Sequence, residues 1–361
     1  MFSVNEQIAE AIRRHSVALL RYETGERKTI LKMLQRLFGD VTTQLRESGL
    51  DGSKGGSYPK RWLNTLFRDV EKIVGGHYDS VTETMQGALA GLAKTEAQWT
   101  ANSLNKILKG DAVLLPPVIS SQLAAAASEV LIQGAASHEW WGRQSEKFLS
   151  SFKDQMRMGW LQGESNDQLL KRLVGGKDVN GNIVFNLAKG TKRGAESLIR
   201  TSVQAIASDA RMRVYRENDD IVKGVVWVAT LDGRTTVECA SFDGLAWDLD
   251  GNPIGHDKVF TPPPLHWGCR STITPYLMSF KELGIKKKEI PESTRASMDG
   301  QVPEKIGFEG WLNKKDQEDP NFVNDQFGIG RAKLWRAGKI SLLDMTDQQG
   351  RELTLTELQK H

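Results

Sequence analysis

The chain has 361 residues, which at roughly 100–200 residues per domain predicts two or three domains. Hydrophobic residues make up 39%, and 34 glycines bring the apolar share near that of globular proteins, which excludes wholesale disorder. The net charge of +3 does not by itself indicate a nucleic-acid binder, and two cysteines are too few for a disulfide-stapled secreted scaffold.

Two features argue against a leader peptide or a membrane span. Residues 1–26 hold three arginines and four glutamates without an apolar core, so we expect no signal peptide. The longest uncharged stretch, residues 112–128, is interrupted by prolines and serines and is shorter than the roughly 20 apolar residues that span a bilayer. We therefore expect no membrane association and a protein that stays inside the cell or joins an assembly built there.

The first part of the chain predicts long helices. Apolar residues recur at steps of three and four over residues 8–38 and again over residues 62–107. A Gly/Ser/Pro linker is expected between them at residues 51–59, and Gly75-Gly76 is expected to break the second helix. These patterns predict a mainly helical N-terminal region.

Shorter helices are expected beyond Pro116-Pro117. An alanine-rich helix is predicted over residues 120–136, and helical spacing continues to Trp160. Ser165 or Asn166 is expected to cap a helix that stops at Gly175-Gly176. Asn180-Gly181 then predicts a short hairpin.

The pattern changes after a long helix predicted over residues 194–217. The β-branched and aromatic run at residues 225–230 predicts a strand, followed by turns and short strands to about residue 276. Residues 281–319 are strongly polar, and a helical tail is expected over residues 330–361. The chain therefore predicts an α+β fold. Its expected parts are a helical region (1–145), a small α+β domain (146–280) and a polar linker with a helical C-terminal tail (281–361).

The chemistry-bearing residues gather between Trp227 and Pro275, and the chain holds no P-loop, GxGxxG, HExxH or GxSxG motif. Both cysteines, Cys239 and Cys269, fall in this region, with His266 three residues before Cys269. These three side chains and a fourth ligand would complete a tetrahedral, structural zinc site. The candidates for the fourth ligand are Asp232, Asp243 and His256.

Two other interpretations of the same residues stay open at this stage. The cysteines would be buried free thiols beside a hydrogen-bonded histidine, or Cys239 and His266 would form a nucleophile and base.

Asp232 would accept hydrogen bonds from neighbouring backbone N–H groups or pair with Arg234 or Arg270. Alternatively it is a plain turn residue. The prolines at 262–264 are expected to deliver the His266 loop along a rigid, extended path.

Four segments occur in an order that resembles a known family. They are WLQGESNDQL at residues 160–169, IRTSVQAIASDAR at 199–211, W-x-A-x-x-D-x-R-T-x-x-x-C-x-x-x-D-G from Trp227, and P-P-x-H-x-x-C-R from Pro263. Together they resemble the phage Mu F-like minor head proteins, also called phage head morphogenesis proteins, over about residues 145–278. Two positions depart from the family pattern. Ser202 stands where the family often has Glu, and Ser271 stands where many members have a second Cys, a thiol that a zinc site would otherwise use.

The resemblance implies a function that composition does not show. It implies a structural, non-enzymatic protein of a tailed-phage head, assembled in the host cytoplasm and incorporated into the virion. It also implies association with the portal protein, the inner surface of the major capsid or a scaffolding protein, and a role in head morphogenesis and in DNA packaging or ejection. The alternative is a Cys/His-dependent enzyme or a toxin-like domain carried in the head, although the tail from residue 281 holds no candidate active-site set.

Two surfaces are predicted for partners. The amphipathic N-terminal helices with their tryptophans are expected to dock on the portal or inner capsid, and the tail with Leu334, Trp335 and Ile340 is a second docking candidate. Residues 186–216 carry seven basic residues against two acidic ones, which favours contact with packaged DNA without sequence specificity. The alternative is a solvated helix. The candidate DNA contacts are Lys192, Arg193, Arg200, Arg211, Arg213 and Arg216.

Overall fold

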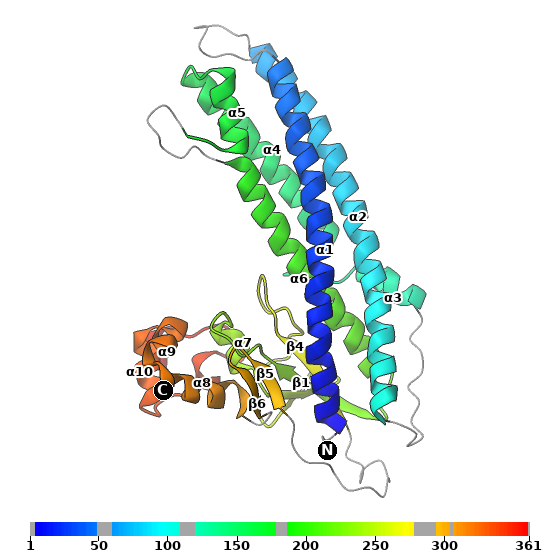
Figure 1. The fold of residues 1–361 in the computed structure, drawn as a ribbon, viewed down its shortest axis with the longest axis vertical. Helices are drawn as coiled ribbons and strands as arrows, with labels where there is room; N and C mark the ends of the chain where they lie inside the picture. Colours follow the sequence, from blue (N-terminus) through cyan, green and yellow to red (C-terminus); the bar gives the residue numbers. More distant parts are fainter. Residues whose placement is uncertain are drawn as a thin grey trace, which may run out of the picture. The chain divides into compact units, whose positions relative to one another are not determined.

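The computed structural model describes residues 4–48, 60–108, 120–177, 186–277, 294–303 and 306–359. Its fold is α+β, as the sequence predicts (Figure 1). The helices are α1 (Val4–Glu47), α2 (Lys60–Leu108), α3 (Ser120–Ala127), α4 (Ser137–Leu161), α5 (Asn166–Val174), α6 (Leu187–Arg216), α7 (Val237–Ser241), α8 (Gly307–Glu318), α9 (Pro320–Phe327), α10 (Ile329–Arg336), the 3-10 helix η3 (Leu343–Met345) and α11 (Leu355–Leu358). The strands are β1 (Val222–Val228), β2 (Ala246–Asp248), β3 (Pro253–Ile254), β4 (Thr272–Leu277), β5 (Thr294–Ser297) and β6 (Gly300–Pro303).

Some predicted features lie outside the described residues. They are the linker at 51–59, the Pro116-Pro117 stop, the hairpin at Asn180-Gly181 and part of the polar segment from residue 281. No helix in the described part of the chain combines the length and apolar character needed to cross a membrane.

The chain forms two compact units that do not follow chain order. The helical unit comprises Arg21–Gly91 and Ala126–Ser202, and the sheet unit comprises Met1–Leu20, Leu92–Ala125 and Val203–His361. Helices α1, α2 and α6 each contribute residues to both units.

An aromatic ladder holds the helical unit together. Phe38 of α1 contacts Phe148 of α4 with ring centroids 6.0 Å apart, and Phe152, one turn further along α4, contacts Phe67 of α2 at 6.3 Å. The three helices lie side by side in this unit (Figure 1). The amphipathic stripe of α1 is buried here, because Leu34 and other residues of its periodic set have no exposed surface.

The predicted break at Gly75-Gly76 is wrong, because α2 continues through both glycines. The apolar residues on either side, Val74 and Tyr78, are buried at helical spacing. Their burial offsets the roughly 1 kcal/mol that each glycine costs a helix relative to alanine.

The other boundaries follow local signals. Ser165 caps α5 as predicted and receives the backbone N–H of Gln168, and α5 ends before Gly175. Helix α6 begins seven residues earlier than predicted, where the Asn186 side chain accepts the Lys189 backbone N–H at 2.9 Å. Helix α3 ends at Ala127, nine residues before the predicted end, and the chain then makes a tight turn at Gln133 and Gly134, where Gly134 has φ of +84°.

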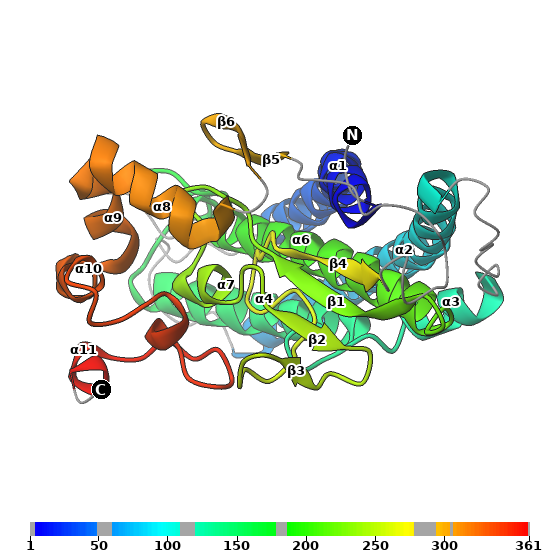
Figure 2. The ribbon, with the colours of Figure 1, turned by 90° about the horizontal axis from the view of Figure 1, so that it is seen from below.

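The sheet unit contains an antiparallel sheet in the order β3-β2-β1-β4 (Figure 2). Strand β1 lies inside the sheet between β2 and β4, and its Trp227 is buried with the rings of Phe242 and Trp247. Gly224 of β1 faces the Trp247 carbonyl so closely that a Cβ would clash with it, so this crossing requires glycine.

The C-terminal extension is part of the sheet unit's core. The buried Lys258 donates to the carbonyls of Leu343, Thr346 and Asp347, and Ser241 of α7 contacts Thr346 at 3.0 Å. Of the three residues predicted for docking by the tail, Leu334 is the one that keeps exposed surface. Trp335 and Ile340 are buried, and the Trp335 indole donates to Glu309.

A buried ion pair joins helices α2 and α6 to strand β4 within the sheet unit. The Arg211 guanidinium contacts the Glu96 carboxylate at 2.5 Å and donates to Thr272 at 2.5 Å, and neither charged side chain is more than 1% exposed. The second Glu96 oxygen contacts His15 of α1 at 2.6 Å, and the His15 ring stacks on Trp99. Burial alone would raise the pKa of Glu96, but Arg211 and His15 outweigh it and hold the pKa below its usual value.

We expect the Glu96→Ala substitution to destabilise the sheet unit by about 3–5 kcal/mol, because it leaves the Arg211 charge buried without a partner. The matched control is Asp209→Asn, which breaks the part-exposed pair with Arg213 on α6 and should cost about 0–1 kcal/mol. Urea unfolding followed by tryptophan fluorescence measures both. Equal losses of stability for the two variants would contradict the structural importance of the buried pair.

Candidate metal centre

Cys239 is positioned by the segment that follows strand β1. The chain turns at Asp232 and enters α7, whose N-cap is Thr236. The Thr236 hydroxyl accepts the Cys239 backbone N–H at 3.4 Å, as expected for a threonine three residues before its partner. The Gln326 side chain of α9 donates to the Thr235 carbonyl and holds this turn.

His266 and Cys269 lie on the loop that leads into β4. The Cys269 backbone N–H donates to the His266 carbonyl at 3.1 Å, and Gly268 supplies the positive φ, +74°, of this turn. Strand β4 then pairs with β1, with Ile273 opposite Trp227. This pairing carries the loop back to the turn that precedes α7.

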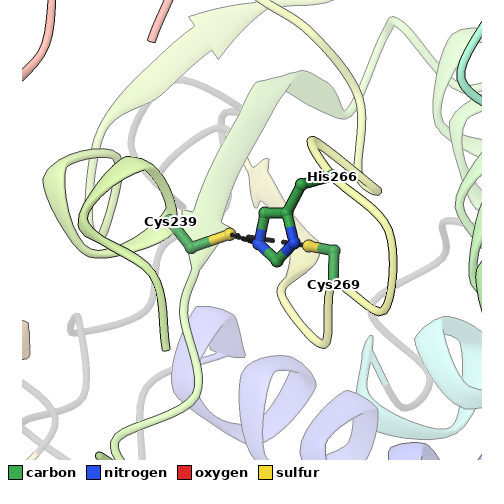
Figure 3. Close-up of side chains that lie close together, drawn as sticks. All are labelled: Cys239, His266 and Cys269. Atoms are coloured by element: carbon green, nitrogen blue, oxygen red, sulfur yellow. Dashed lines mark hydrogen bonds between the residues drawn. The ribbon is translucent and has the colours of Figure 1, made fainter. Parts of the chain in front are cut away.

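The three predicted side chains converge (Figure 3). Cys239 Sγ lies 3.2 Å from His266 Nε2 and 3.5 Å from Cys269 Sγ, and all three ligand atoms lie within 4.8 Å of one another. Both cysteines are only 2% exposed and are free thiols, and His266 is half-buried. Among the described residues, this is the group of histidine, cysteine and carboxylate side chains whose geometry suits a metal ion.

The two ring nitrogens of His266 have different neighbours. Nδ1 lies 3.1 Å from the Trp267 carbonyl oxygen. A carbonyl can only accept, so Nδ1 carries a proton, and Nε2 is the nitrogen that faces Cys239 and lies 3.0 Å from the Thr236 hydroxyl. Metal-binding histidines usually have this arrangement, in which the second ring N–H donates to a carbonyl or carboxylate.

The cluster favours one thiolate. The hydrogen bond from Cys239 lowers the pKa of Cys269 and, despite burial, His266 lowers it further. The same contact with Cys269, together with burial, raises the pKa of Cys239. Hydrogen bonding to Cys269 raises the pKa of His266 against the opposing effect of burial. The two sulfur atoms therefore share one proton readily.

The three predicted candidates for a fourth ligand all have other partners. Asp232 forms a two-point ion pair with Arg270, with one contact of 2.7 Å, and accepts the Arg234 backbone N–H at 2.9 Å. Asp243 accepts the backbone N–H groups of Ala229 and Phe308. His256 contacts the Ala246 carbonyl through Nε2 and accepts the Lys258 N–H at Nδ1.

A small cavity of about 20 Å³ adjoins the cluster. Cys239 and His266 both line it, together with polar side chains. Its remaining lining residues are Thr230, Arg234, Thr235, Thr236, Gly268, Arg270 and Ser271. The cavity has room for one water molecule or ion. The Cys239–His266 distance of 3.2 Å also suits a nucleophile and its base.

The predicted DNA contacts are scattered rather than gathered. Arg211 is wrong as a contact, because it is fully buried against Glu96. Arg200 pairs with Glu23, and Arg213 pairs with Asp209. The Lys192 ammonium lies over the Phe38 ring, while Arg193 and Arg216 are exposed.

Several residues that shape the site were not singled out from the sequence. Thr236 could have been found, because a threonine directly before a short helix is a common N-cap, and this helix carries Cys239. Gln326 and Lys258 could not, because their partners lie 91 and 85–89 positions away in the chain.

Residues 150–274 match the family model described as Phage Mu protein F like protein. The chain carries a phage Mu F-like domain. The matched span runs from the middle of α4 to β4 and includes the Cys239, His266 and Cys269 cluster, so it confirms the resemblance read from the four ordered segments. No curated protein and no solved structure matches the chain.

We expect the Asp232–Arg270 pair to make the stability of the Mu F-like domain depend on pH. Burial raises the pKa of Asp232, but hydrogen bonds from Arg270 and the Arg234 N–H outweigh it, so the folded-state pKa lies below the usual value of about 3.9. A lowered pKa means that the contribution is present above the unfolded-state pKa and is lost as the pH falls through the folded-state pKa.

We expect Asp232→Asn to lower the free energy of unfolding by about 1.5–3 kcal/mol at pH 7, the range for hydrogen bonds to charged groups. The difference between wild type and variant should shrink as the pH falls from about 5 toward 2. Urea unfolding of both proteins across this range measures it. A difference that does not change with pH would contradict a charged Asp232 in the folded domain.

Proposed function

We propose that this protein is a minor head protein of a tailed bacteriophage, bound near the portal and acting in head morphogenesis and in DNA packaging or ejection. The Mu F-like domain is the observation that carries the proposal. The two family segments that carry Cys239, His266 and Cys269 lie in the same compact unit as the C-terminal extension, which suits a structural component.

We propose a structural rather than an enzymatic role. The thiols of Cys239 and Cys269 are buried, and the adjoining cavity holds about 20 Å³. An enzyme of the Cys/His class needs a substrate-sized opening at its nucleophile. The alternative, a toxin-like domain in the C-terminal extension, gains no support from α8 and α9, whose aromatic side chains Phe308, Trp311 and Phe322 form a packed core.

The docking surface is better sought among exposed apolar residues than in the amphipathic stripes. Most apolar residues of the α1 and α2 stripes are buried in the core, although Val17 and Leu20 of α1 are about half exposed, and the buried tryptophans include Trp141, Trp227 and Trp247. On α4, however, Met158 is 44% and Leu161 is 77% exposed, three residues apart on one face. Exposed apolar side chains near one end of a helical unit suit a contact with the portal, with the inner capsid or scaffolding protein as the alternatives.

We expect the double variant Met158→Ser, Leu161→Ser to lose co-purification with the portal protein while keeping its unfolding midpoint, because both side chains are exposed. Lys147→Ser, an exposed change on the same helix, is the control and should bind normally. Deleting the N-terminal helices would be a poorer test, because it removes Glu96 and leaves Arg211 unpaired. Undiminished portal binding by the double variant would place the contact elsewhere.

Sequence-independent contact with packaged DNA is a second candidate role. The first turns of α6 present Lys189 and Arg193 to solvent, with Lys192 on the same face. Most of the later basic residues are buried or paired, so any DNA contact is best sought at this end of the helix. Phosphate contacts would add to the head role by holding DNA near the protein without reading its sequence.

We expect Lys189→Gln, Lys192→Gln, Arg193→Gln to reduce binding to unrelated duplexes equally. The salt dependence should flatten by about one unit of slope for each phosphate that the variant no longer touches. The control changes the same charge elsewhere, with Lys314, Lys333 and Lys339 replaced by Gln. Fluorescence anisotropy at several salt concentrations measures both. An identical salt slope for the two triple variants would favour the solvated-helix interpretation.

A further inference from the structure

We propose that Cys239, His266 and Cys269 bind one Zn²⁺ as a three-ligand site whose fourth position is taken by a water molecule in the adjoining cavity. The proposal rests on the geometry of these residues and is independent of the head-protein function. It differs from the closed, four-protein-ligand site that the sequence suggested.

The donor set and its spacing suit zinc. Two thiolates and one imidazole are ligands that zinc prefers. Two sulfurs bound tetrahedrally at about 2.3 Å from zinc lie ~3.8 Å apart. The observed Sγ to Sγ distance is 3.5 Å, and Nε2 lies 3.2 Å from Cys239 Sγ, so small side-chain rotations would open the group around an ion.

The groups around the three ligands are already arranged for a metal. His266 donates Nδ1–H to the Trp267 carbonyl, which leaves Nε2 able to coordinate. The Cys239 backbone is fixed by the Thr236 cap, and the Cys269 backbone by the turn at Gly268. Each ligand is therefore held by a different local restraint rather than by a flexible surface loop.

The charges balance without a fourth protein ligand. Zn²⁺ with two thiolates is a neutral unit, and its formation releases the thiol protons to solvent. The Arg270 guanidinium, which would otherwise repel a cation, is neutralised by Asp232. In this interpretation Asp232 is a positioning residue that pairs with Arg270 and does not touch the metal.

The cavity decides what completes the coordination. It borders both Cys239 and His266, its volume of about 20 Å³ suits one water, and the hydroxyl-bearing residues Thr230, Thr235 and Ser271 line it. The carboxylates of Asp232 and Asp243 already accept other donors. The bound ion would link α7 to the loop before β4 and stabilise the irregular segment between β3 and β4.

The primary test uses the untagged wild-type full chain, purified without chelators and dialysed against metal-free buffer. We expect about one zinc per chain by elemental analysis, with both thiols protected from a thiol reagent until a chelator is added. Cobalt substitution should give the thiolate charge-transfer band and the strong d–d bands of a tetrahedral site. Zinc-free protein with two freely titrating thiols, or with a Cys239–Cys269 disulfide, would overturn the proposal.

Variants separate the ligands from their neighbours. Cys239→Ser should lose the zinc, whereas His138→Gln, which changes an exposed histidine on α4, should keep it. Asp232→Asn leaves the Arg270 charge unneutralised, so it should bind the metal more weakly, but at saturating cobalt it should give the wild-type spectrum because Asp232 does not touch the metal. A changed spectrum of cobalt-saturated Asp232→Asn would make Asp232 the fourth ligand and overturn the water-completed site. Because Cys239→Ser also removes core packing, the wild-type cobalt spectrum tests the site without depending on that variant's folding.

Discussion

The buried ion pair between Arg211 and Glu96 is the constraint on which the sheet unit depends. A guanidinium without exposed surface is tolerated only when a carboxylate and further acceptors surround it, and Glu96 and Thr272 supply them. The pair fixes how α2 and α6 meet the start of β4. His15, bound to the second Glu96 oxygen, adds α1 to the same junction.

This junction has a consequence for the Mu F-like domain. Arg211 lies inside the span matched by the family model, whereas Glu96 and His15 lie outside it. Lys258 likewise lies inside the matched span, whereas the carbonyls of Leu343 and Thr346 that accept its hydrogen bonds lie outside it. Residues 150–274 alone would therefore leave Arg211 and Lys258 without these partners. Residues 1–20 and 92–125 and the C-terminal extension thus belong to the same compact unit as residues 203–274 of the domain.

The junction also adjoins the Cys/His cluster. Strand β4 begins at Thr272, the partner of Arg211, three residues after Cys269, and Gln204 of α6 contacts the Ser271 carbonyl. The same strand start thus receives α6 on one side and delivers the His266–Cys269 loop on the other. The position of the cluster follows from the helix–sheet packing as well as from its own hydrogen bonds.

The sequence predicted the features that depend on local patterns. Strand β1 and the Ser165 cap follow from residue type, and the convergence of Cys239, His266 and Cys269 was expected from their spacing, whereas metal binding itself stays a prediction. Features set by distant partners were not predictable. Nothing near Arg211 in the chain marks it as buried, because Glu96 lies 115 positions away. Gly75-Gly76 signalled a break that the burial of Val74 and Tyr78 overrides.

The proposed head component is thus a Mu F-like domain built together with flanking helices and a packed C-terminal extension. Quantitative mass spectrometry of purified procapsids and virions, calibrated against the major capsid protein, tests this most directly. We expect peptides of this chain in the particles, at few copies per particle relative to the major capsid protein. Its absence from both particles, with the protein found only free in the infected cell, would contradict the head-protein assignment.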